Sequence, residues 1–526
     1  MPSSTPGSPL ILRDLVVRGA SQRRDARVVT WRDGHAHVQT LPHTVERAQG
    51  LTRGLANLGV QPGDRVATLM WNDHHHLEAY LAVPCMGAVL HALNLRLPED
   101  DLAWVIEDAG DTIILADQDN LEMAQTLAAR CDCQVVAACD CDVEGTVDWE
   151  TLAATPGDDP WPVLDEETPM GICHTSGTTG RPRGVVYTHR STCLHTLMIS
   201  MTDFIGLSCH DRLLGIVPMF HALGWGLPYA ACMLGADQVM PGVRPQSSDL
   251  LDMIDAEHVT CAAAVATVWS MVMESLKADP KRWDCSSLER IACGGSSASR
   301  ELRHWYQETL GLRLGRTWGM TELNPVGTFP INQEEGDDSG IALPTLQMKL
   351  EDDEGQPVPY DGRSVGHLLV QGPTVVQGYL HDRNEGHFKD GWLVTGDIAS
   401  LGEHGELTIR DRDKDVIKSG GEWVSSLEVE LKIDDVAGVS YCAVVGRPHP
   451  TWGERPVAMV VLEPGAQISA ENILSGLQSL EKWQRPDDFL FVEALPMTGT
   501  GKIDKRAIRS MLDEQAYVLP SLRSST

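Results

Sequence analysis

The chain has 526 residues, 42% of them apolar, and carries a formal net charge of −32 at pH 7. A chain of this length exceeds one hydrophobic core, so we expect two or more domains. The acidic balance disfavours nucleic-acid binding and attraction to an anionic membrane, because both require a basic surface. We find neither a run of about 18 apolar residues nor a signal-peptide pattern, which predicts a cytoplasmic protein without a membrane span.

The charge is distributed unevenly along the chain. Residues 411–526 contain 13 Lys and Arg against 18 Asp and Glu, which leaves −5, so the preceding residues carry the other −27 of the −32. An anionic cosubstrate therefore meets less repulsion at the C-terminal part. The 13 cysteines are odd in number and form no regular framework, which suits a reducing compartment.

One cysteine cluster needs weighing as a metal site. The segment CDCQVVAACDC contains Cys131, Cys133, Cys139 and Cys141. Structural zinc usually takes C-x₂₋₄-C pairs, whereas these pairs are C-x-C, and the QVVAA between them is typical of a buried strand. The spacing favours the strand, and the role of the cluster stays open.

The N-terminal half alternates strands and helices. Residues 27–40 alternate as a hairpin does. The later patterns predict helices over 44–58, 80–90, 98–107 and 121–129, and strands over 66–70, 112–116, 259–268 and 290–297. Such alternation predicts layered, largely parallel α/β sheets. Three consecutive histidines, residues 74–76, point in different directions on a helix, so they predict a solvated helix start and not a metal site.

The stretch TSGTTGRPRG, residues 175–184, lies between two apolar runs and predicts a phosphate-binding loop between strands. Glycines let backbone N–H groups turn toward an anion, hydroxyls add donors, and Arg181 and Arg183 add charge suited to phosphate. The loop lacks the Walker pattern, and on this segment alone a flexible surface loop is the alternative. Its central residues are Thr175, Ser176, Gly177, Thr178, Thr179 and Gly180.

This loop resembles the signature of the adenylate-forming superfamily: acyl-CoA synthetases, adenylation domains of peptide synthetases, and beetle luciferases. Four further stretches match in the family's order: TWGMTE (317–322), GWLVTGD (391–397), DRDKDVIKSGGEW (411–423) and PMTGTGKIDKRAIR (496–509). The resemblance covers nearly the whole chain. It implies a large N-terminal domain of layered parallel-rich sheets with a small β subdomain, residues 1–411, and a small mobile C-terminal α/β domain, residues 412–526.

The resemblance also implies a nucleotide site at the ends of parallel strands, where ligands bind in open sheets. Trp318 would face the adenine, Asp397 would take two ribose hydroxyls, and Arg412 would contact ribose or phosphate. The remaining ATP or AMP contacts are residues 175–180, Gly295, Thr317, Gly319, Met320 and Thr321.

Three residues gain catalytic roles from the resemblance. Lys502 follows Gly-Thr-Gly as the family's catalytic lysine does, and His221 would lie near the reacting carboxylate. Glu322 offers a hard oxygen for Mg²⁺, with Thr178 as a second metal contact. Taken alone, a single glutamate or lysine is usually solvated surface.

The acyl pocket is implied by PMFHALGWGLPYAACMLGA, residues 218–236, which on its own reads as an apolar helix with one satisfied histidine. With the resemblance, the pocket residues are Trp225, Gly294, Gly295 and Met320. Two positions depart from the family: Ala266 and Ser299 stand where proline is usual, which loosens the backbone beside the pocket and leaves the acid open.

The C-terminal part predicts a hinge and a second substrate site. Lys414 falls at the family's hinge position, and a glycine loop follows that would face CoA: Lys418, Gly420, Gly421, Glu422 and Trp423. Short strands are predicted at MKLED, HLLVQ and VVQGY within residues 340–378, and a compact α/β domain is predicted from 426 onward, with helices over 426–431 and 470–480 and strands over 440–445, 457–462 and 488–491.

The predicted function is an acyl-CoA synthetase that uses ATP, Mg²⁺ and coenzyme A. It would form acyl-AMP from an apolar acid and, after the C-terminal domain rotates about Lys414, transfer the acyl group to CoA. An enzyme of one half-reaction, a ligase that loads a carrier-protein phosphopantetheine, and a binding protein without chemistry are the alternatives. Arg183 stands where Lys is common, and a forked guanidinium holds phosphate differently. The acid, fatty, aryl or bulky cyclic, and the oligomeric state, for which a homodimer is compatible, stay open.

Overall fold

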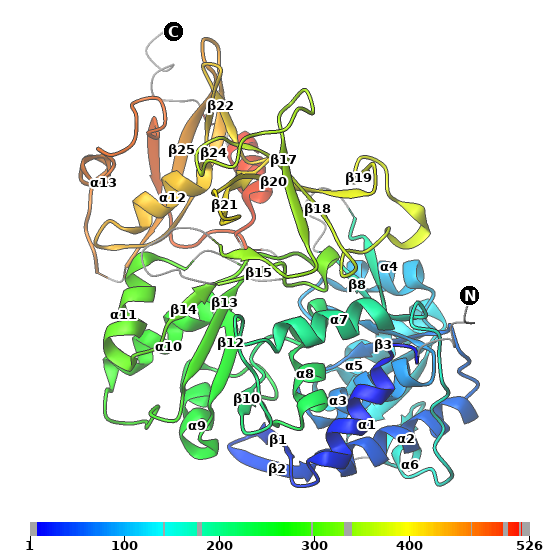
Figure 1. The fold of residues 1–526 in the computed structure, drawn as a ribbon. Coiled ribbons are helices and arrows are strands. Elements are labelled where there is room, and N and C mark those ends of the chain that lie inside the picture. Colours follow the sequence, from blue (N-terminus) through cyan, green and yellow to red (C-terminus); the bar gives the residue numbers. More distant parts are fainter. Residues whose placement is uncertain are drawn as a thin grey trace.

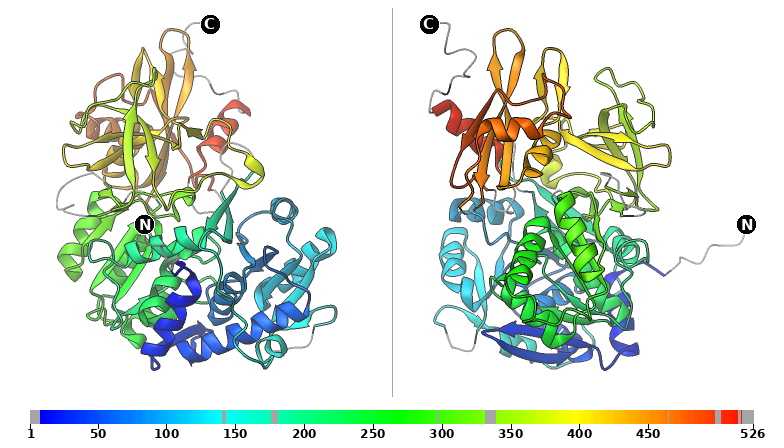
Figure 2. Two further views of the ribbon diagram at one scale, coloured as in Figure 1. Left: turned by 45° about the vertical axis from the view of Figure 1, so that its right-hand side comes forward. Right: turned by 90° about the vertical axis from the view of Figure 1, so that its left-hand side faces the viewer.

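The computed structural model describes residues 8–139, 143–175, 181–295, 298–330, 339–463, 465–497, 503–514 and 517. Two large sheets and their helices form the lower part in Figure 1, and two smaller sheets lie above them. The views of Figure 2 show the same division from two other sides. Within the described ranges, no helix is long and apolar enough to cross a membrane.

The first large sheet has seven strands in the order β14-β13-β12-β10-β11-β1-β2. All neighbours are parallel except β1 and β2, the predicted hairpin. Its turn, Asp33-Gly34, has φ of 50° and 76°, which is what a two-residue hairpin turn requires. The strands are β1 (Arg27–Arg32), β2 (His35–Thr40), β10 (Arg212–Leu214), β11 (Asp237–Met240), β12 (Cys261–Val265), β13 (Arg290–Gly294) and β14 (Leu314–Arg316).

The second large sheet also has seven strands, in the order β7-β6-β5-β3-β4-β8-β9. Only the edge pair β8 and β9 is antiparallel, and the loop of residues 175–183 connects these two strands. The strands are β3 (Arg65–Leu69), β4 (Val89–Ala92), β5 (Ile113–Asp117), β6 (Gln134–Ala138), β7 (Val147–Asp148), β8 (Pro169–His174) and β9 (Gly184–Thr188). The predicted parallel-rich α/β class is confirmed.

Helices connect and cover the two large sheets (Figure 1). The largest core cluster joins Val28 of the first sheet, Leu90 of the second, Tyr80 of α3 and Tyr229 of α8, so one core spans both sheets. The helices are α1 (Leu12–Gln22), α2 (Leu41–Asn57), α3 (His74–Cys85), α4 (Glu99–Ala109), η1 (Gln118–Asn120), α5 (Leu121–Cys131), α6 (Trp149–Ala153), α7 (His189–Ile199), η2 (Ala222–Gly226), α8 (Leu227–Leu234), α9 (Ser247–Glu257), α10 (Ala266–Ala278), α11 (Arg300–Leu310) and η3 (Thr321–Leu323).

A small antiparallel sheet follows, in the order β17-β18-β20-β19, with β21 beside β20. This matches the predicted β subdomain. The strands and the short helix of this region are β17 (Gln347–Glu351), β18 (Gly366–Gln371), η4 (Leu380–Asp382), β19 (Phe388–Lys389), β20 (Trp392–Leu401) and β21 (Leu407–Arg412); the short pair β15 (Thr328–Phe329) and β16 (Ile341–Ala342) precedes it.

The C-terminal part is a compact α/β unit with its own core on both faces of a five-stranded sheet. Each helix and strand predicted from residue 426 onward is present, although α13 ends four residues earlier than predicted. The elements are β22 (Ile417–Ser419), β23 (Glu422–Val424), α12 (Ser426–Asp434), β24 (Val439–His449), β25 (Gly453–Leu462), α13 (Ala470–Gly476), β26 (Asp488–Phe491) and α14 (Lys505–Glu514).

Four local predictions are wrong. The strand predicted over 259–268 ends at Val265, and the helix α10 begins at Ala266. The apolar run 80–90 is not one helix: α3 ends at Cys85, Gly87 turns the chain with φ 90°, and β4 begins at Val89. VVQGY contains no strand, only an isolated bridge between Tyr379 and Val185. The histidines at the start of α3 are not solvated, because His76 is fully buried and its ring nitrogens contact the Thr68 hydroxyl and the Trp71 carbonyl.

Candidate active site

The base of the phosphate loop is closed by backbone contacts. The Thr175 amide donates to the Arg183 carbonyl at 2.9 Å, and the Arg183 amide donates to the Thr175 hydroxyl at 3.2 Å. These bonds continue the β8–β9 ladder by one step and bring the two ends of the loop together. Residues 176–180 lie outside the described residues, so their predicted phosphate contacts stay predictions.

Arg183 connects this loop to the predicted magnesium residue through Tyr379. Its guanidinium lies 5.5 Å from the centre of the Tyr379 ring and contacts the His387 ring nitrogen. The Tyr379 hydroxyl donates to Glu322 Oε1 at 2.6 Å. Three segments far apart in the sequence therefore meet at Tyr379, whose ring contacts Arg183 and whose hydroxyl contacts Glu322.

Glu322 fits a magnesium ion held together with nucleotide phosphates. Carboxylate oxygens are hard ligands, and Mg²⁺ is commonly bound by one or two of them plus substrate phosphates. Burial raises the pKa of Glu322, while the hydrogen bond from Tyr379 opposes that shift; a bound cation favours the ionised form. Thr178 lies outside the described residues, and those that are described form no group of three or more His, Cys, Asp or Glu side chains suited to a metal.

The predicted nucleotide residues Trp318, Asp397 and Arg412 form one connected group. The Trp318 indole nitrogen donates to Asp397 Oδ2 at 2.9 Å, and Arg412 Nε lies 2.8 Å from Asp397 Oδ1. Asp397 is only 2% exposed, whereas the Arg412 side chain is 43% exposed. A carboxylate in a fixed position can accept hydrogen bonds from ribose hydroxyls, and an exposed guanidinium beside it can donate to a phosphate. Both kinds of hydrogen bond are strengthened by the charge of the side chain. The Trp318 ring itself is nearly buried against Gly327, so its adenine contact stays a prediction.

The predicted acyl residues meet this group where two parallel strands end side by side. β13 ends at Gly294 and β14 at Arg316, and the Thr317 amide donates to the Cys293 carbonyl at 3.0 Å. Trp225 reaches the same point: a methyl group at Gly294 would lie 2.8 Å from its ring and 2.9 Å from the Thr317 hydroxyl. A side chain at position 294 would collide with the Trp225 ring, so glycine at this position leaves room for the tryptophan.

The other loop residues lie nearby. Gly295 follows β13 with φ 78°, Met320 donates its amide to the Pro325 carbonyl at 2.9 Å, and Gly319 bridges to Val326. The Thr321 carbonyl accepts from Tyr187 at 2.7 Å, which ties η3 to β9. These bonds order the TWGMTE segment as a loop.

Trp225 is presented by a left-handed turn. Ala222, Leu223 and Trp225 have φ of 46°, 49° and 57°, and the two glycines of η2 are also in the left-handed region. Each non-glycine residue there costs roughly 1–2 kcal/mol. His221 is the residue just before this turn, and its amide donates to the Pro218 carbonyl at 3.0 Å. The apolar helix, which is the alternative for this segment taken alone, begins only at α8, after the strained turn.

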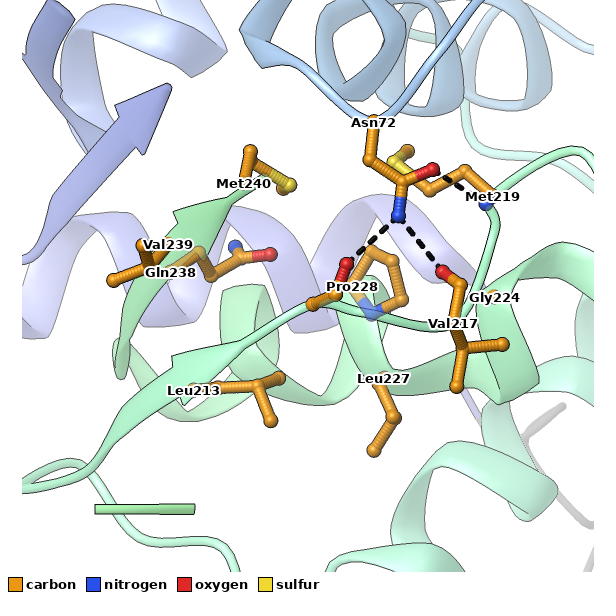
Figure 3. Close-up of a pocket in the computed structure, with 11 residues that line it drawn as sticks. Asn72, Leu213, Val217, Met219, Gly224, Leu227, Pro228, Gln238, Val239 and Met240 are labelled. Atoms are coloured by element: carbon orange, nitrogen blue, oxygen red, sulfur yellow. Dashed lines mark hydrogen bonds between the residues drawn. The ribbon is translucent and has the colours of Figure 1, made fainter. Parts of the chain in front are cut away.

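Asn72 holds the segment that precedes this turn (Figure 3). Its amide nitrogen donates to the carbonyls of Gly215 and Val217 at 2.8 Å each, and its oxygen accepts from the Met219 amide at 2.8 Å. A cavity of about 10 Å³ lies beneath, lined mainly by apolar residues of β10, β11 and α8. It is large enough for about one water molecule, and none of the predicted acyl residues Trp225, Gly294, Gly295 and Met320 lines it.

The predicted hinge and CoA residues lie in the segment that begins the C-terminal part. Lys414 follows β21, and burial lowers its pKa. The Lys418 ammonium lies 5.7 Å from the Trp423 ring on the β22–β23 hairpin, whose turn is Gly420-Gly421 and whose second strand begins at Glu422. The Gly420 amide donates to the Trp452 carbonyl at 2.8 Å. Lys502 lies outside the described residues.

Several residues of this site were missed from the sequence. Tyr379 gave no signal, because it lies 57 positions from Glu322, and Asn72 is an isolated polar residue before a helix. At Ser299 the prediction of a looser backbone is wrong: it is the N-cap of α11, where its hydroxyl accepts from the Leu302 amide at 3.2 Å. Ser in this position is a common helix-capping signal.

Comparison with known proteins gives the class. The AMP-binding enzyme family matches residues 16–380, and the AMP-binding enzyme C-terminal domain matches residues 428–502. The chain therefore belongs to the AMP-binding enzyme family, which is the adenylate-forming superfamily that its motifs indicate.

Individual relatives agree with this assignment. A long-chain-fatty-acid–CoA ligase of Thermus thermophilus is 38% identical, covering 97% of this chain and 96% of the relative. A 3-methylmercaptopropionyl-CoA ligase of Ruegeria lacuscaerulensis is 35% identical, covering 95% and 97%. Among solved structures, an anthranilate CoA ligase in complex with anthranoyl-AMP superposes with a TM-score of 0.88 at 24% identity, covering 97% of this chain and 99% of that one, which confirms the fold.

Proposed function

We propose that this enzyme is an acyl-CoA synthetase acting on an apolar carboxylic acid. The carboxylate oxygen attacks the α-phosphorus of ATP, pyrophosphate leaves, and acyl-AMP forms. The CoA thiol then gives up its proton and attacks the acyl carbon, and AMP leaves. The observation that carries the proposal is the convergence of Glu322, Trp318, Asp397 and Arg412 at the strand ends that Trp225 also reaches.

Each group has a chemical part in this scheme. Asp397 and Arg412 hold the ribose and its phosphate, and Lys502 adds positive charge at the crowded α-phosphorus. Glu322, with Thr178, would hold Mg²⁺, which supplies further positive charge beside the phosphates when bound. His221 orients the reacting carboxylate, and Trp225 borders the acyl group.

The two half-reactions fit two domains, residues 1–411 and 412–526. Rotation about Lys414 would withdraw Lys502 after adenylation and bring the glycine loop of residues 418–423 to the thiol path. A reducing, cytoplasmic setting suits the 13 cysteines, of which the 12 that are described are free thiols.

The acid class follows from the pocket and the relatives. Trp225 and the apolar residues around it favour an apolar acid of medium or larger size. The Thermus relative is named for long-chain fatty acids and the Ruegeria relative for a short thioether acid, so both lengths belong in the test.

A panel of fatty, thioether, aryl and cyclic acids, scored for CoA thioester by mass spectrometry with pyrophosphate measured separately, tests the proposal. Thioester and pyrophosphate in equal amounts from one acid class support it. Pyrophosphate without thioester indicates the alternative of an enzyme limited to acyl-AMP formation. Thioester formed only from supplied acyl-AMP indicates an enzyme of the second half-reaction. The absence of both thioester and pyrophosphate with every acid would contradict an acyl-CoA synthetase.

A further inference from the structure

A buried chain of two carboxyl groups and two imidazoles leads to the entrance of the phosphate loop. Asp111 Oδ2 lies 2.6 Å from His91 Nδ1, His91 Nε2 lies 2.9 Å from His174 Nδ1, and His174 Nε2 lies 3.2 Å from Asp108 Oδ2. All four side chains are at most 5% exposed. We call Asp111, His91, His174 and Asp108 the carboxylate–imidazole chain. His174 is the residue immediately before Thr175.

The number of protons in this chain follows from its three contacts. Each contact needs one hydrogen, so the chain needs three. Two neutral histidines carry two, and two ionised carboxylates carry none. One additional proton must therefore be bound, either on Asp111 or as a second proton on a ring. Without it, His91 would donate to Asp111 and His174 to Asp108, which would leave two lone pairs facing each other across 2.9 Å.

The surroundings favour keeping this proton. Arg383 donates to both oxygens of Asp108, at 2.5 and 3.2 Å, so Asp108 is the ionised end. His381 Nε2 donates to the Asp108 carbonyl at 2.8 Å. With the extra proton, the charge of the chain is −1, which Arg383 balances.

At the buried end of the carboxylate–imidazole chain, the Asp111 carboxyl group accepts no hydrogen bond from an arginine among the described residues. Asp111 Oδ1 makes no hydrogen bond, and Arg65 of β3 directs its guanidinium to the carbonyls of Ala109 and Gly110. The Cys133 thiol donates to the Asp111 carbonyl at 3.2 Å. Burial raises the pKa of Asp111 and lowers that of His174 to about 4, as expected if Asp111 holds the proton and the His174 ring is neutral.

Side chains of helix α4 contact both ends of the phosphate loop. Trp104 and Asp108 are four residues apart and so share one face of the helix. Asp108 contacts His174 at the loop entrance. The Arg181 guanidinium, on the C-terminal side of the loop, lies 5.2 Å from the Trp104 ring centre, and that of Arg383 lies 5.6 Å from it. The Trp104 ring also meets the His174 ring edge-on at 6.1 Å.

We propose that the carboxylate–imidazole chain positions the phosphate loop on α4, and that it does so only while it carries its extra proton. His91 and His174 are positioning residues and touch no reacting atom. Deprotonation at alkaline pH turns an attractive contact between the two rings into a repulsive one, which shifts the end of β8 and the Thr175 amide with it. This inference rests on the proposed use of ATP at the loop.

The pH dependence of ATP use tests the proposal in the full-length enzyme. Pyrophosphate release is measured with ATP varied and the acid saturating, from about pH 6 to about pH 9.5. We expect kcat/KM for ATP of the wild type to fall at alkaline pH with a one-proton transition. His174→Phe should lower it about ten-fold at neutral pH, as the loss of buried hydrogen bonds predicts, and abolish the transition.

Two further variants separate positioning from stability. His174→Gln places an amide nitrogen near the position of Nε2 and keeps a donor for Asp108, so it should recover part of the ATP kcat/KM with a pH-independent profile. His189→Asn is the matched control: His189 is buried outside the chain, and its Nδ1 accepts from the Leu12 amide at 3.3 Å. It should keep the alkaline transition. A His174→Phe enzyme that loses only thermal stability, or that keeps the transition, contradicts the proposal.

A spectroscopic measurement keeps this test independent of turnover. In ¹⁵N-histidine-labelled protein, we expect exchange-protected ring N–H signals from His91 and His174 that persist at neutral pH, and we expect the His91 signal to change in His174→Phe. Ring nitrogens that exchange freely would overturn the proton count. If the wild type releases no pyrophosphate with any acid, the proposed function fails, while these signals still decide whether the chain binds its proton.

Discussion

Replacing Tyr379 with phenylalanine tests the Glu322 site most directly. The change removes the hydroxyl that donates to Glu322 Oε1 at 2.6 Å and keeps the ring that lies 5.5 Å from Arg183. The variant therefore loses the hydrogen bond to the carboxyl group and keeps the cation–π contact with Arg183. The ring stays in place because it also packs edge-on against His387 and Phe388.

The size of the effect follows from the hydrogen bond. A hydrogen bond to a charged group contributes about 1.5–3 kcal/mol, and about 1.4 kcal/mol corresponds to one pKa unit. Burial already raises the pKa of Glu322, and the Tyr379 hydroxyl lowers it. Without that hydroxyl, the pKa of Glu322 should rise further. An activity that needs the carboxylate is lost as the pH falls through this pKa, so the acid limb should move to higher pH.

The assay is pyrophosphate release as a function of pH at saturating and at limiting Mg²⁺. We expect the Tyr379→Phe acid limb to shift upward, and the shift to shrink at saturating Mg²⁺, because bound cation favours the ionised carboxyl group. Tyr360→Phe is the control, since that hydroxyl donates to the Met348 carbonyl at 3.1 Å in the small sheet. An unchanged acid limb at limiting Mg²⁺ would refute a magnesium role for Glu322.

Three further outcomes are expected. Trp225→Ala should change the relative kcat/KM of bulky and slender acids by about ten-fold or more in competition assays, with an ATP KM close to that of wild type. Lys502→Ala should slow acyl-AMP formation by about two to three decades and leave thioester formation from supplied acyl-AMP intact; equal loss in both assays would contradict two poses. Glu78→Ala should lower the free energy of unfolding by about 3–5 kcal/mol in urea titration, because it leaves Arg47 and Trp149 without a buried carboxylate.

Much of the fold could be predicted because local pattern and tertiary environment agree. The β1–β2 hairpin has an Asp-Gly turn, and both turn residues take the positive φ that this sequence favours. The run 80–90 failed for the opposite reason. It is apolar throughout, so periodicity cannot distinguish the end of α3 from the start of β4.

The site could be predicted only where a motif carries its own chemistry. Glu322, Asp397 and Arg412 belong to three motifs, and the structure brings them together as expected. Tyr379 and His174 belong to no such pattern, and their importance comes from long-range partners that one sequence does not reveal. The left-handed turn at Trp225 could not be predicted from the sequence either, because tertiary packing against Gly294 overrides the local backbone preference of Ala222 and Leu223.

At the predicted hinge, the domain boundary that the motifs suggest differs from the boundary that the hydrogen bonds suggest. Asp411 pairs along its backbone with Ile398 in the small sheet, yet its carboxylate accepts from the amide and hydroxyl of Ser426 at the start of α12, at 2.5 and 2.6 Å. The same hydroxyl accepts from Lys505 of α14 at 2.6 Å. A rotation that left Asp411 behind would strip a buried carboxylate of two donors, each worth about 1.5–3 kcal/mol.

The ion pair beyond Asp411 belongs to the C-terminal part. Arg509 of α14 donates to Asp415 at 2.8 Å and to the Lys414 carbonyl at 3.4 Å, so the segment that follows β21 is already bound to the C-terminal part. A rotation about Lys414 therefore keeps the Arg509–Asp415 ion pair and separates the Asp411 carboxylate from Ser426 of α12. We therefore expect Lys414 to mark the hinge in sequence, and we expect the two hydrogen bonds from Ser426 to Asp411 to stabilise the described pose against that rotation.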